Sequence, residues 1–168
     1  KTFLFFAIPL FLLLLINYNG QLKNRFVNQT KAHITTNNYW SPHFLTAIEI
    51  FKSNKIFGNG IKTFRIECQK EIYDKIKTKH INKRCSTHPH NFYLEILSET
   101  GILGILILLS VNSYILTYLI KNFFQNKNFK SEILLIFCSF FILFWPLQTT
   151  GAFFSSWNGL FYWIFFSF

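Results

Sequence analysis

Charged residues are scarce in this chain. Only 14% of its 168 residues are Asp, Glu, Lys or Arg, whereas about a quarter of the residues of an average soluble domain are charged. In contrast, 51% of the residues are hydrophobic and 20% are aromatic. Because the apolar residues form continuous blocks and are not spread at the spacing of a soluble core, the composition disfavours a soluble domain and indicates a membrane protein.

Methionine is absent, and the chain is already apolar from Phe3. We therefore expect the sequence to be a fragment of a longer protein. The stretch Thr2–Ile16 could be a signal peptide, because Lys1 precedes an apolar run. No small-x-small cleavage site follows it, however, so we interpret the stretch as part of a truncated transmembrane helix.

Acidic residues are the rarest charged type, with seven against 17 Lys and Arg. Residues 19–91 contain 13 of these 17 basic residues, only four acids, and all five histidines. One interpretation is a solvated loop from a proteome rich in Lys and Asn. The other is a basic surface that attracts an anionic ligand or lipid headgroups.

Four apolar blocks predict an all-α integral membrane protein with about four transmembrane helices. At about 1.5 Å per residue, residues 92–120 would extend ~43 Å, more than the ~30 Å hydrocarbon core. Their first two turns are polar, so we expect Gly101–Ile120 to form the span. The predicted segments are a truncated transmembrane helix over 1–18, a large periplasmic loop over 19–91, a long transmembrane helix with a periplasmic extension over 92–120, a cytoplasmic loop over 121–130 and two transmembrane helices over 131–168.

The orientation follows from the short loop 121–130, which contains three lysines and no acid. The positive-inside rule places such a loop in the cytoplasm. Residues 19–91 then lie outside, in the periplasm of a bacterium, and the protein is a multi-pass protein of the inner membrane. The basic character of this loop is compatible with export, because long loops translocate largely regardless of charge.

Short amphipathic helices are expected within the large loop. In "HFLTAIEIFKS" (43–53), Phe44, Ala47, Ile48 and Phe51 recur at helical spacing, which predicts a helix that could lie on the membrane surface. "GNG" (58–60) predicts a turn after it. A second helix is predicted over 69–79, where Ile72 and Ile76 are four residues apart.

The three cysteines fall into two groups. Cys138 lies within the third apolar block, where it is expected to be a small buried hydrophobic residue. Cys68 and Cys85 lie in the exported loop, so a disulfide between them is predicted. A zinc site that adds His88 and His90 to these cysteines is the alternative, but no C-x₂–₄-C pair supports it. We therefore predict no metal.

The stretch "THPHNFYLEILSETGILG" (87–104) permits two interpretations. In the structural one, Asn91 caps the following helix, and Gly101 and Gly104 let a neighbouring helix pack closely. In the chemical one, the helix N-terminus attracts an anion and His90 acts as a general base. Glu95 or Glu99 would orient the imidazole, and Arg65 and Arg84 could each form bidentate hydrogen bonds to a phosphate.

The spacing in this stretch, His-Asn, nine residues, Gly, two residues, Gly, resembles the signature of the O-antigen ligase and O-antigen polymerase family. The upstream segment "FLTAIEIFKSNKIFGNGIKTFR" (44–65) is also similar to the family pattern, including the turn glycines Gly58 and Gly60. Family members have about a dozen membrane helices and one large periplasmic loop. The resemblance implies that this chain is a C-terminal fragment of such a protein.

The resemblance implies glycosyl transfer without a metal or cofactor. The donor would be a glycan on undecaprenyl pyrophosphate, and the acceptor a hydroxyl of lipid A-core or of another glycan; membrane lipids are further partners, and nucleic acid is not. His90 matches the motif histidine that activates the acceptor, and Arg65 matches an arginine that binds the pyrophosphate. A second family arginine is missing from "NNYWSPHF", and Arg25 could replace it. Further expected substrate contacts are Arg84, Asn91 and His88.

Three alternatives remain open at this point. A polymerase of the same family shares the motif, although ligase is our preference. A polytopic transporter or flippase would use the basic loop only to admit an anion, but the spans contain no ionisable residue of the kind that a substrate pathway needs. The third alternative is a membrane-embedded segment without catalytic activity.

Overall fold

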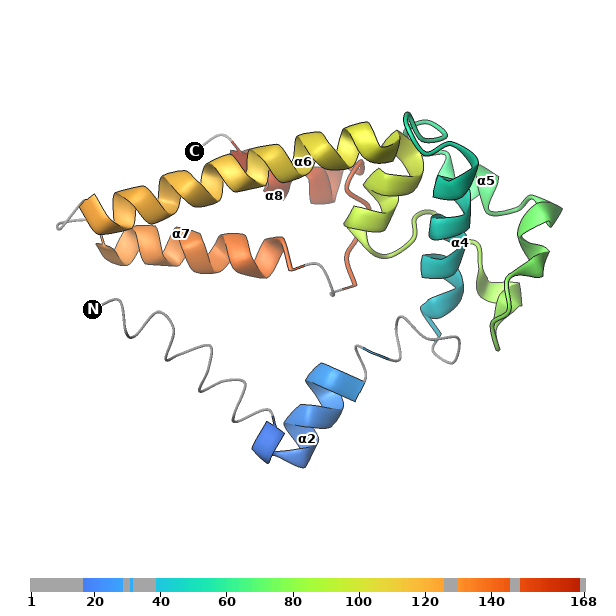
Figure 1. Ribbon diagram of the computed structural model, residues 1–168, viewed down its shortest axis with the longest axis horizontal. Helices are drawn as coiled ribbons and strands as arrows, with labels where there is room; N and C mark the ends of the chain where they lie inside the picture. Colours follow the sequence, from blue (N-terminus) through green and yellow to red (C-terminus); the bar gives the residue numbers. More distant parts are fainter. Residues whose placement is uncertain (1–16, 29–30, 32–38, 126–129, 146–148, 167–168) are drawn as a thin grey trace.

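The computed structural model describes residues 17–28, 31, 39–125, 130–145 and 149–166, and the secondary structure of these residues is entirely helical (Figure 1). The expected truncated helix at the start of the chain therefore lies largely outside the described residues. The elements are α2 (Gly20–Lys23), the π-helix η1 (Asn24–Asn28), α4 (Ser41–Ser53), α5 (Phe64–Glu67), the 3₁₀ helices η2 (Glu71–Lys75) and η3 (Ile81–Lys83), α6 (Phe92–Gln125), α7 (Lys130–Leu143) and α8 (Ser156–Phe166).

Helix α6 is broken at Gly101, whose backbone is not helical (φ 68°, ψ −161°). The short part before the break and the long part after it run in different directions (Figure 1). Residues 102–125 extend about 36 Å, enough to cross a ~30 Å hydrocarbon core. Within the described part of the chain, α6 is the one helix long and apolar enough to do so. Its outer face carries exposed side chains such as Ile107 (67%) and Tyr114 (72%), as a lipid-facing surface requires.

The two helices after α6 are shorter. Helix α7 packs beside α6 in the opposite direction (Figure 1), and at about 1.5 Å per residue α7 and α8 extend only ~21 Å and ~16 Å. The expected number of four spans therefore remains a prediction. The expectation that Cys138 is buried is wrong: it is exposed on α7, because α7 turns a different face, with Ile133 and Phe140, toward the core.

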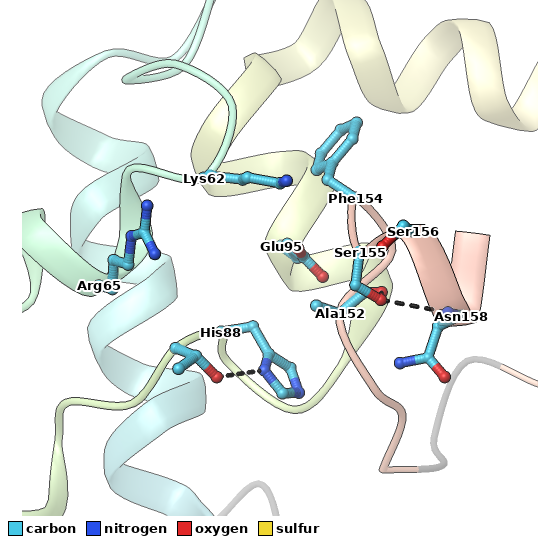
Figure 2. A pocket seen from close by; sticks show the side chains of 10 residues that line it. Lys62, Arg65, His88, Glu95, Ala152, Phe154, Ser155, Ser156 and Asn158 are labelled. Atoms are coloured by element: carbon cyan, nitrogen blue, oxygen red, sulfur yellow. Dashed lines mark hydrogen bonds between the residues drawn. The ribbon is translucent and has the colours of Figure 1, made fainter.

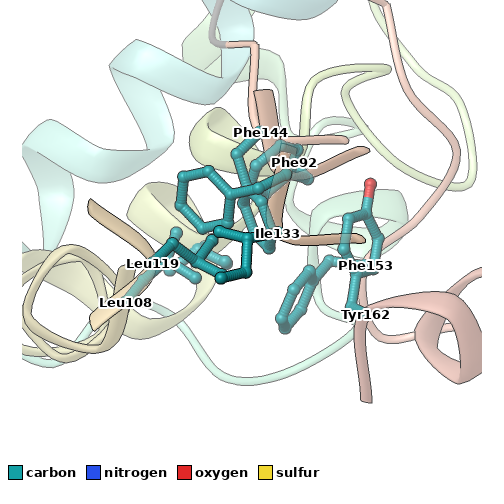
Figure 3. Close-up of a cluster of buried hydrophobic side chains, with 9 residues drawn as sticks. Phe92, Leu108, Leu119, Ile133, Phe144, Phe153 and Tyr162 are labelled. Carbon is teal, nitrogen blue, oxygen red and sulfur yellow. The ribbon is translucent and has the colours of Figure 1, made fainter. Parts of the chain in front are cut away.

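An aromatic cluster joins the first turn of α6 to the chain that follows α7 (Figure 3). The ring of Phe92 lies 5.9 Å from that of Phe144, 5.9 Å from that of Phe153 and 5.4 Å from that of Tyr162, centroid to centroid. Offset and edge-on pairs at these distances contribute about 0.5–1.5 kcal/mol each beyond their buried area. The cluster thus holds residues 149–155 and the start of α8 against the polar end of α6.

Helix α4 is the amphipathic helix that the sequence predicted over 43–53. Its buried face differs from the expected one: Phe44 and Ala47 are buried, whereas Ile48 and Phe51 are only half-buried. The face is completed by residues that include His43, Thr46 and Ile50, and it packs against α6. The helix is therefore part of the protein core and does not lie free on the membrane surface.

The second predicted helix, over 69–79, is wrong. Only the 3₁₀ turn η2 forms, and the chain becomes extended at Ile76. The inward-facing residue is Tyr73, which is buried beside Cys68, while Ile72 is 64% exposed. The apolar pair four residues apart was therefore not the inner face of a helix, because packing around the nearby Cys68 selects Tyr73 instead.

The Gly-x-Gly turn docks on the break in α6. A helix break leaves backbone N–H and C=O groups without intrahelical partners, and here residues 55–60 supply them. The hydrogen bonds run from Asn59 N to Ser98 O (3.2 Å), from Gly60 N to Glu99 O (2.9 Å), from Ile102 N to Lys55 O (2.8 Å) and from Leu103 N to Ile56 O (3.3 Å). Gly101 therefore accommodates a loop, not the neighbouring helix that we expected. At Gly104 an added Cβ would meet the side chain of Thr100, in the preceding turn of α6 itself.

Replacement of Gly101 by alanine should detach this turn. The φ and ψ of Gly101 lie in a region that is essentially restricted to glycine, and an added Cβ would collide with the carbonyl of Ile56. We expect Gly101→Ala to lower the free energy of unfolding by at least ~1–3 kcal/mol, measured by thermal unfolding of the full-length protein in detergent. Gly20→Ala is the matched control, because nothing lies within 4 Å of its Cβ position. Equal stability of the two variants would contradict the docking role.

Candidate functional site

A pocket of about 370 Å³ opens where three segments meet: the chain after the Gly-x-Gly turn, the approach to α6, and the segment between α7 and α8 (Figure 2). This volume is in the range of small-ligand sites. The lining residues are Lys62, Arg65, Thr87, His88, Glu95, Ala152, Phe154, Ser155, Ser156 and Asn158. Of the residues predicted from sequence, Arg65 and His88 line the pocket, whereas His90, Asn91 and Arg84 do not.

Two buried glutamates hold the walls of the pocket. The Glu99 carboxylate accepts hydrogen bonds from the N–H groups of Lys62 (2.6 Å) and Phe64 (3.1 Å). One helical turn earlier, the Glu95 carboxylate accepts one from Phe153 N–H (2.7 Å). The hypothesis that one of these glutamates orients the imidazole of His90 is therefore wrong, because both carboxylates bind backbone N–H groups of the pocket walls.

The pocket carries an excess of positive charge. Lys62 and Arg65 are exposed, and in the described part of the chain neither forms a salt bridge. Glu67, the acid nearest to Arg65 in the sequence, pairs with Lys70 instead (2.7 Å). The only acid in the lining is Glu95. Burial raises its pKa to about 7, although the hydrogen bond from Phe153 acts in the opposite direction, so this carboxyl is only partly ionised near neutral pH.

The approach to α6 is held in an unusual backbone conformation. His90 has a positive φ of 59°, a value that is uncommon outside glycine. Its carbonyl accepts a hydrogen bond from Thr150 N–H (2.8 Å), and the Thr150 hydroxyl oxygen accepts one from Phe92 N–H (2.8 Å). Asn91 caps the helix through Leu94 N–H (3.1 Å), as the structural interpretation predicted. The side chain of Asn91 is thus directed to α6.

His90 belongs to a cluster of rings beside the pocket. Its ring centroid lies 4.3 Å from that of His88, 4.6 Å from that of Trp40 and 5.1 Å from that of His43. His88 Nδ1 lies 2.9 Å from the Thr87 hydroxyl and Nε2 3.3 Å from the Thr150 carbonyl. His90 Nε2 lies 3.1 Å from the Ser86 hydroxyl. His88 therefore stands on the pocket wall, with His90 directly behind it.

The histidines of this cluster are neutral at physiological pH. Burial, followed by the proximity of His88 and His43, lowers the pKa of His90 to about 4. Burial also lowers the pKa of His88 and that of His43. A neutral imidazole has a lone pair that can accept a proton, which is the state that a general base needs.

The family model for O-antigen ligase matches residues 1–109. The chain belongs to the O-antigen ligase family. The resemblance drawn from the His-Asn and Gly-x-Gly spacing is thereby confirmed, and membership implies an enzyme of lipopolysaccharide synthesis that acts at a membrane on a lipid-linked glycan and an acceptor sugar. No curated protein and no solved structure matches the chain.

Two expected substrate contacts of this O-antigen ligase family member have other places in the structure. The Arg84 guanidinium donates to the Cys68 carbonyl (2.9 Å) and pairs with Asp74 (2.6 Å), beside the disulfide that joins Cys68 and Cys85. These contacts fix the fold of the loop outside the pocket. Arg25 lies in η1, and its side chain lies outside the described part of the chain.

The sequence did not single out several pocket residues of this O-antigen ligase family member. Lys62 could have been predicted as a pocket residue from the sequence, because it is a cation between the Gly-x-Gly turn and Arg65. Half of the lining residues lie between Ala152 and Asn158, beyond the region that the family model matches. No local pattern links Thr150, Ser155 and Asn158 to the His-Asn motif, since α6 and α7 separate them along the chain.

Proposed function

We propose that the protein is a ligase-type glycosyltransferase that transfers a glycan from undecaprenyl pyrophosphate to an acceptor hydroxyl, at the periplasmic face of the bacterial inner membrane. The observation that carries this proposal is the pocket itself. Two cations without salt bridges, Lys62 and Arg65, line a cavity next to neutral histidines at the polar end of an apolar helix. This arrangement suits an anionic headgroup with a lipid tail.

In the proposed reaction, the acceptor oxygen forms a bond to the anomeric carbon of the donor sugar. The bond from that carbon to the pyrophosphate oxygen breaks, and the electron pair leaves with the pyrophosphate. His90 takes the proton of the acceptor hydroxyl. Arg65 stabilises the charge on the leaving pyrophosphate, so that fixed cations perform the neutralisation that a metal ion performs in other enzymes.

His90 is the better base of the two histidines in the motif. Both ring nitrogens of His88 are engaged, one by the Thr87 hydroxyl and one by the Thr150 carbonyl. His90 has a hydrogen bond at Nε2 only, so that Nδ1 has no hydrogen-bond partner within the described part of the chain. His88 then serves to separate His90 from the phosphate-binding part of the pocket and to help keep it neutral.

The membrane places the donor and the acceptor on one surface. Residues 102–125 of α6 would cross the bilayer, with the Lys-rich connection to α7 on the cytoplasmic side and the pocket on the periplasmic side. A lipid-linked donor confined to the membrane face reaches the pocket without a three-dimensional search. Orientation of the two reactants then supplies much of the rate enhancement.

The experiment that tests this function is glycan transfer in membranes that contain the full-length protein. The donor is a glycan on undecaprenyl pyrophosphate, and the two acceptors are lipid A-core and a second lipid-linked repeat. Transfer to lipid A-core identifies a ligase, and chain extension on the lipid-linked repeat identifies a polymerase of the same family. Donor movement across the bilayer without a new glycosidic bond would instead identify a flippase and contradict the proposal.

A further inference from the structure

We propose that Lys62 and Arg65 form a two-point site that selects a diphosphate over a monophosphate, and that Glu99 is the positioning residue that holds this site together. The inference deepens the proposed function and rests on it, because it states that the pocket recognises the diphosphate of the donor. Neither Lys62 nor Glu99 was expected from the sequence to contact a phosphate or to position a residue that does.

The two cations enter the pocket separately. In Figure 2 the Lys62 side chain extends over Glu95 toward Phe154, whereas the Arg65 guanidinium lies on the opposite side of the pocket, away from Phe154. The ammonium group of Lys62 and the guanidinium group of Arg65 therefore lie at different parts of one cavity. A single phosphoryl group can be held by the Arg65 fork alone, but a ligand with two linked phosphoryl groups can reach both cations.

The cavity is large enough for this ligand. Its volume of about 370 Å³ lies within the range of about 300–1,000 Å³ that is typical of small-ligand pockets, so two linked phosphoryl groups can be accommodated. The amide of Asn158 also lines the cavity, and its N–H groups can donate hydrogen bonds to phosphate oxygens. The Ser155 hydroxyl, in contrast, already donates to the Ala152 carbonyl (2.9 Å).

Glu99 fixes the backbone on which both cations stand. Its carboxylate accepts from the N–H of Lys62 and from the N–H of Phe64, the residue before Arg65. Lys62 also has a positive φ of 61°, which is unfavourable for a lysine unless the surroundings impose it. The buried Glu99 carboxylate is the group that imposes it, since both N–H groups converge on this one side chain.

Binding of inorganic pyrophosphate and of inorganic phosphate, measured by calorimetry on the detergent-solubilised full-length protein, tests the site. One charge-assisted contact changes affinity by about ten- to a hundredfold. Lys62→Ala should therefore weaken pyrophosphate binding by that factor and phosphate binding by less than about threefold. Lys62→Arg should retain the preference for pyrophosphate. Lys77→Ala, which removes an exposed cation of the same loop outside the pocket, should leave both affinities unchanged.

Glu99→Gln tests the positioning role, because an amide has one acceptor oxygen where the carboxylate has two. We expect it to weaken pyrophosphate binding in the wild-type background and to have a clearly smaller effect when Lys62 is already alanine, which is the signature of coupled residues. A merely structural role would give the same factor in both backgrounds. Retention of the Cys68–Cys85 disulfide and of the elution volume shows that the variants are folded.

The outcomes separate this inference from the proposed function. Equal losses for pyrophosphate and phosphate in Lys62→Ala, a matching loss in Lys77→Ala, or no pyrophosphate binding by the wild type would overturn the two-point site. Glycan transfer by the wild type could still be present in each case. Conversely, a preference for pyrophosphate that depends on Lys62, in a protein that transfers no glycan, supports the site and contradicts the transferase.

Discussion

His90→Ala is expected to reduce glycan transfer by at least about 100-fold, the usual effect of losing a general base. Pyrophosphate binding should be nearly unchanged, because His90 stands behind His88 and does not line the pocket. Transfer is measured in membranes with the undecaprenyl-linked donor, and binding is measured on the same protein in detergent. A loss of turnover without a loss of binding is the result that assigns His90 to the chemical step.

His88→Ala is the matched control for His90→Ala, since it removes the neighbouring ring of the same motif. It should reduce transfer much less, and it should also raise the pKa of His90 by removing one nearby ring that opposes its protonation. Near-normal turnover of His90→Ala would mean that this histidine serves only the backbone turn at the start of α6. The catalytic role would then be wrong.

The pH dependence of transfer follows from the same base. In the proposed mechanism the neutral form of His90 is the active form. With a pKa of about 4, lowered mainly by burial, this form predominates above pH 4 and is lost as the pH falls through that value. The kcat of the wild type at saturating donor, which is separate from the binding step that the titration of Glu95 in the pocket affects, should therefore stay level from pH 8 down to about pH 5 and fall below it. An unperturbed histidine would lose activity near pH 6.5. A pH–rate profile checks this, and a fall centred near pH 6.5 would contradict it.

Arg65→Ala is expected to reduce transfer by about ten- to a hundredfold, since a charged hydrogen bond to an anion contributes roughly 1.5–3 kcal/mol. Arg65→Lys should recover only part of this loss, because an ammonium is a point charge and cannot hold two phosphate oxygens in the planar fashion of a guanidinium. Donor turnover and donor KM are measured for both variants. The order wild type, lysine, alanine is the expected order of activity.

Lys77→Ala and Arg84→Ala are the comparisons that give the Arg65 result its meaning. Lys77 is an exposed cation outside the pocket, and Arg84 is engaged by Asp74 and by backbone carbonyls. Lys77→Ala should leave transfer intact, and Arg84→Ala should lower stability before it affects donor KM. Equal, mild losses at Arg65, Lys77 and Arg84 would indicate attraction by diffuse charge and remove the specific role of Arg65.

The parts of the fold that could be predicted are those with local signals. Helix α4 follows from apolar residues at helical spacing, and the start of α6 follows from Asn91 before an apolar run. The buried face of α4 could not be predicted, because the surface on which it packs is formed by α6, far along the chain. The predicted helix over 69–79 failed for a similar reason: burial of Tyr73 beside Cys68 outweighs the spacing of Ile72 and Ile76.

In the candidate site, too, only the residues that belong to local sequence patterns could be predicted. The motif spacing predicted His90 and Arg65 as site residues and Gly58 and Gly60 as turn glycines, since these residues lie in short segments with recognisable patterns. The roles of Glu95 and Glu99 could not be read from their positions, because their partners are backbone N–H groups of other segments. The contribution of residues 150–158 was also hidden, since long-range contacts bring them to the start of α6: the aromatic cluster around Phe92 and the hydrogen bonds of Thr150 and Phe153.

In the proposed membrane orientation, the break in α6 would set the depth of the pocket relative to the bilayer. Irregular backbone is tolerated at membrane depth only where protein groups satisfy its hydrogen bonds, and here the carbonyls of Lys55 and Ile56 and the N–H groups of Asn59 and Gly60 do so. Gly101 can therefore sit at the edge of the hydrocarbon layer without exposing unpaired groups to lipid. In the proposed function the pocket would then lie at the height of the phosphates of the surrounding lipids, so that a diphosphate on a long prenyl chain would reach it without being lifted out of the membrane.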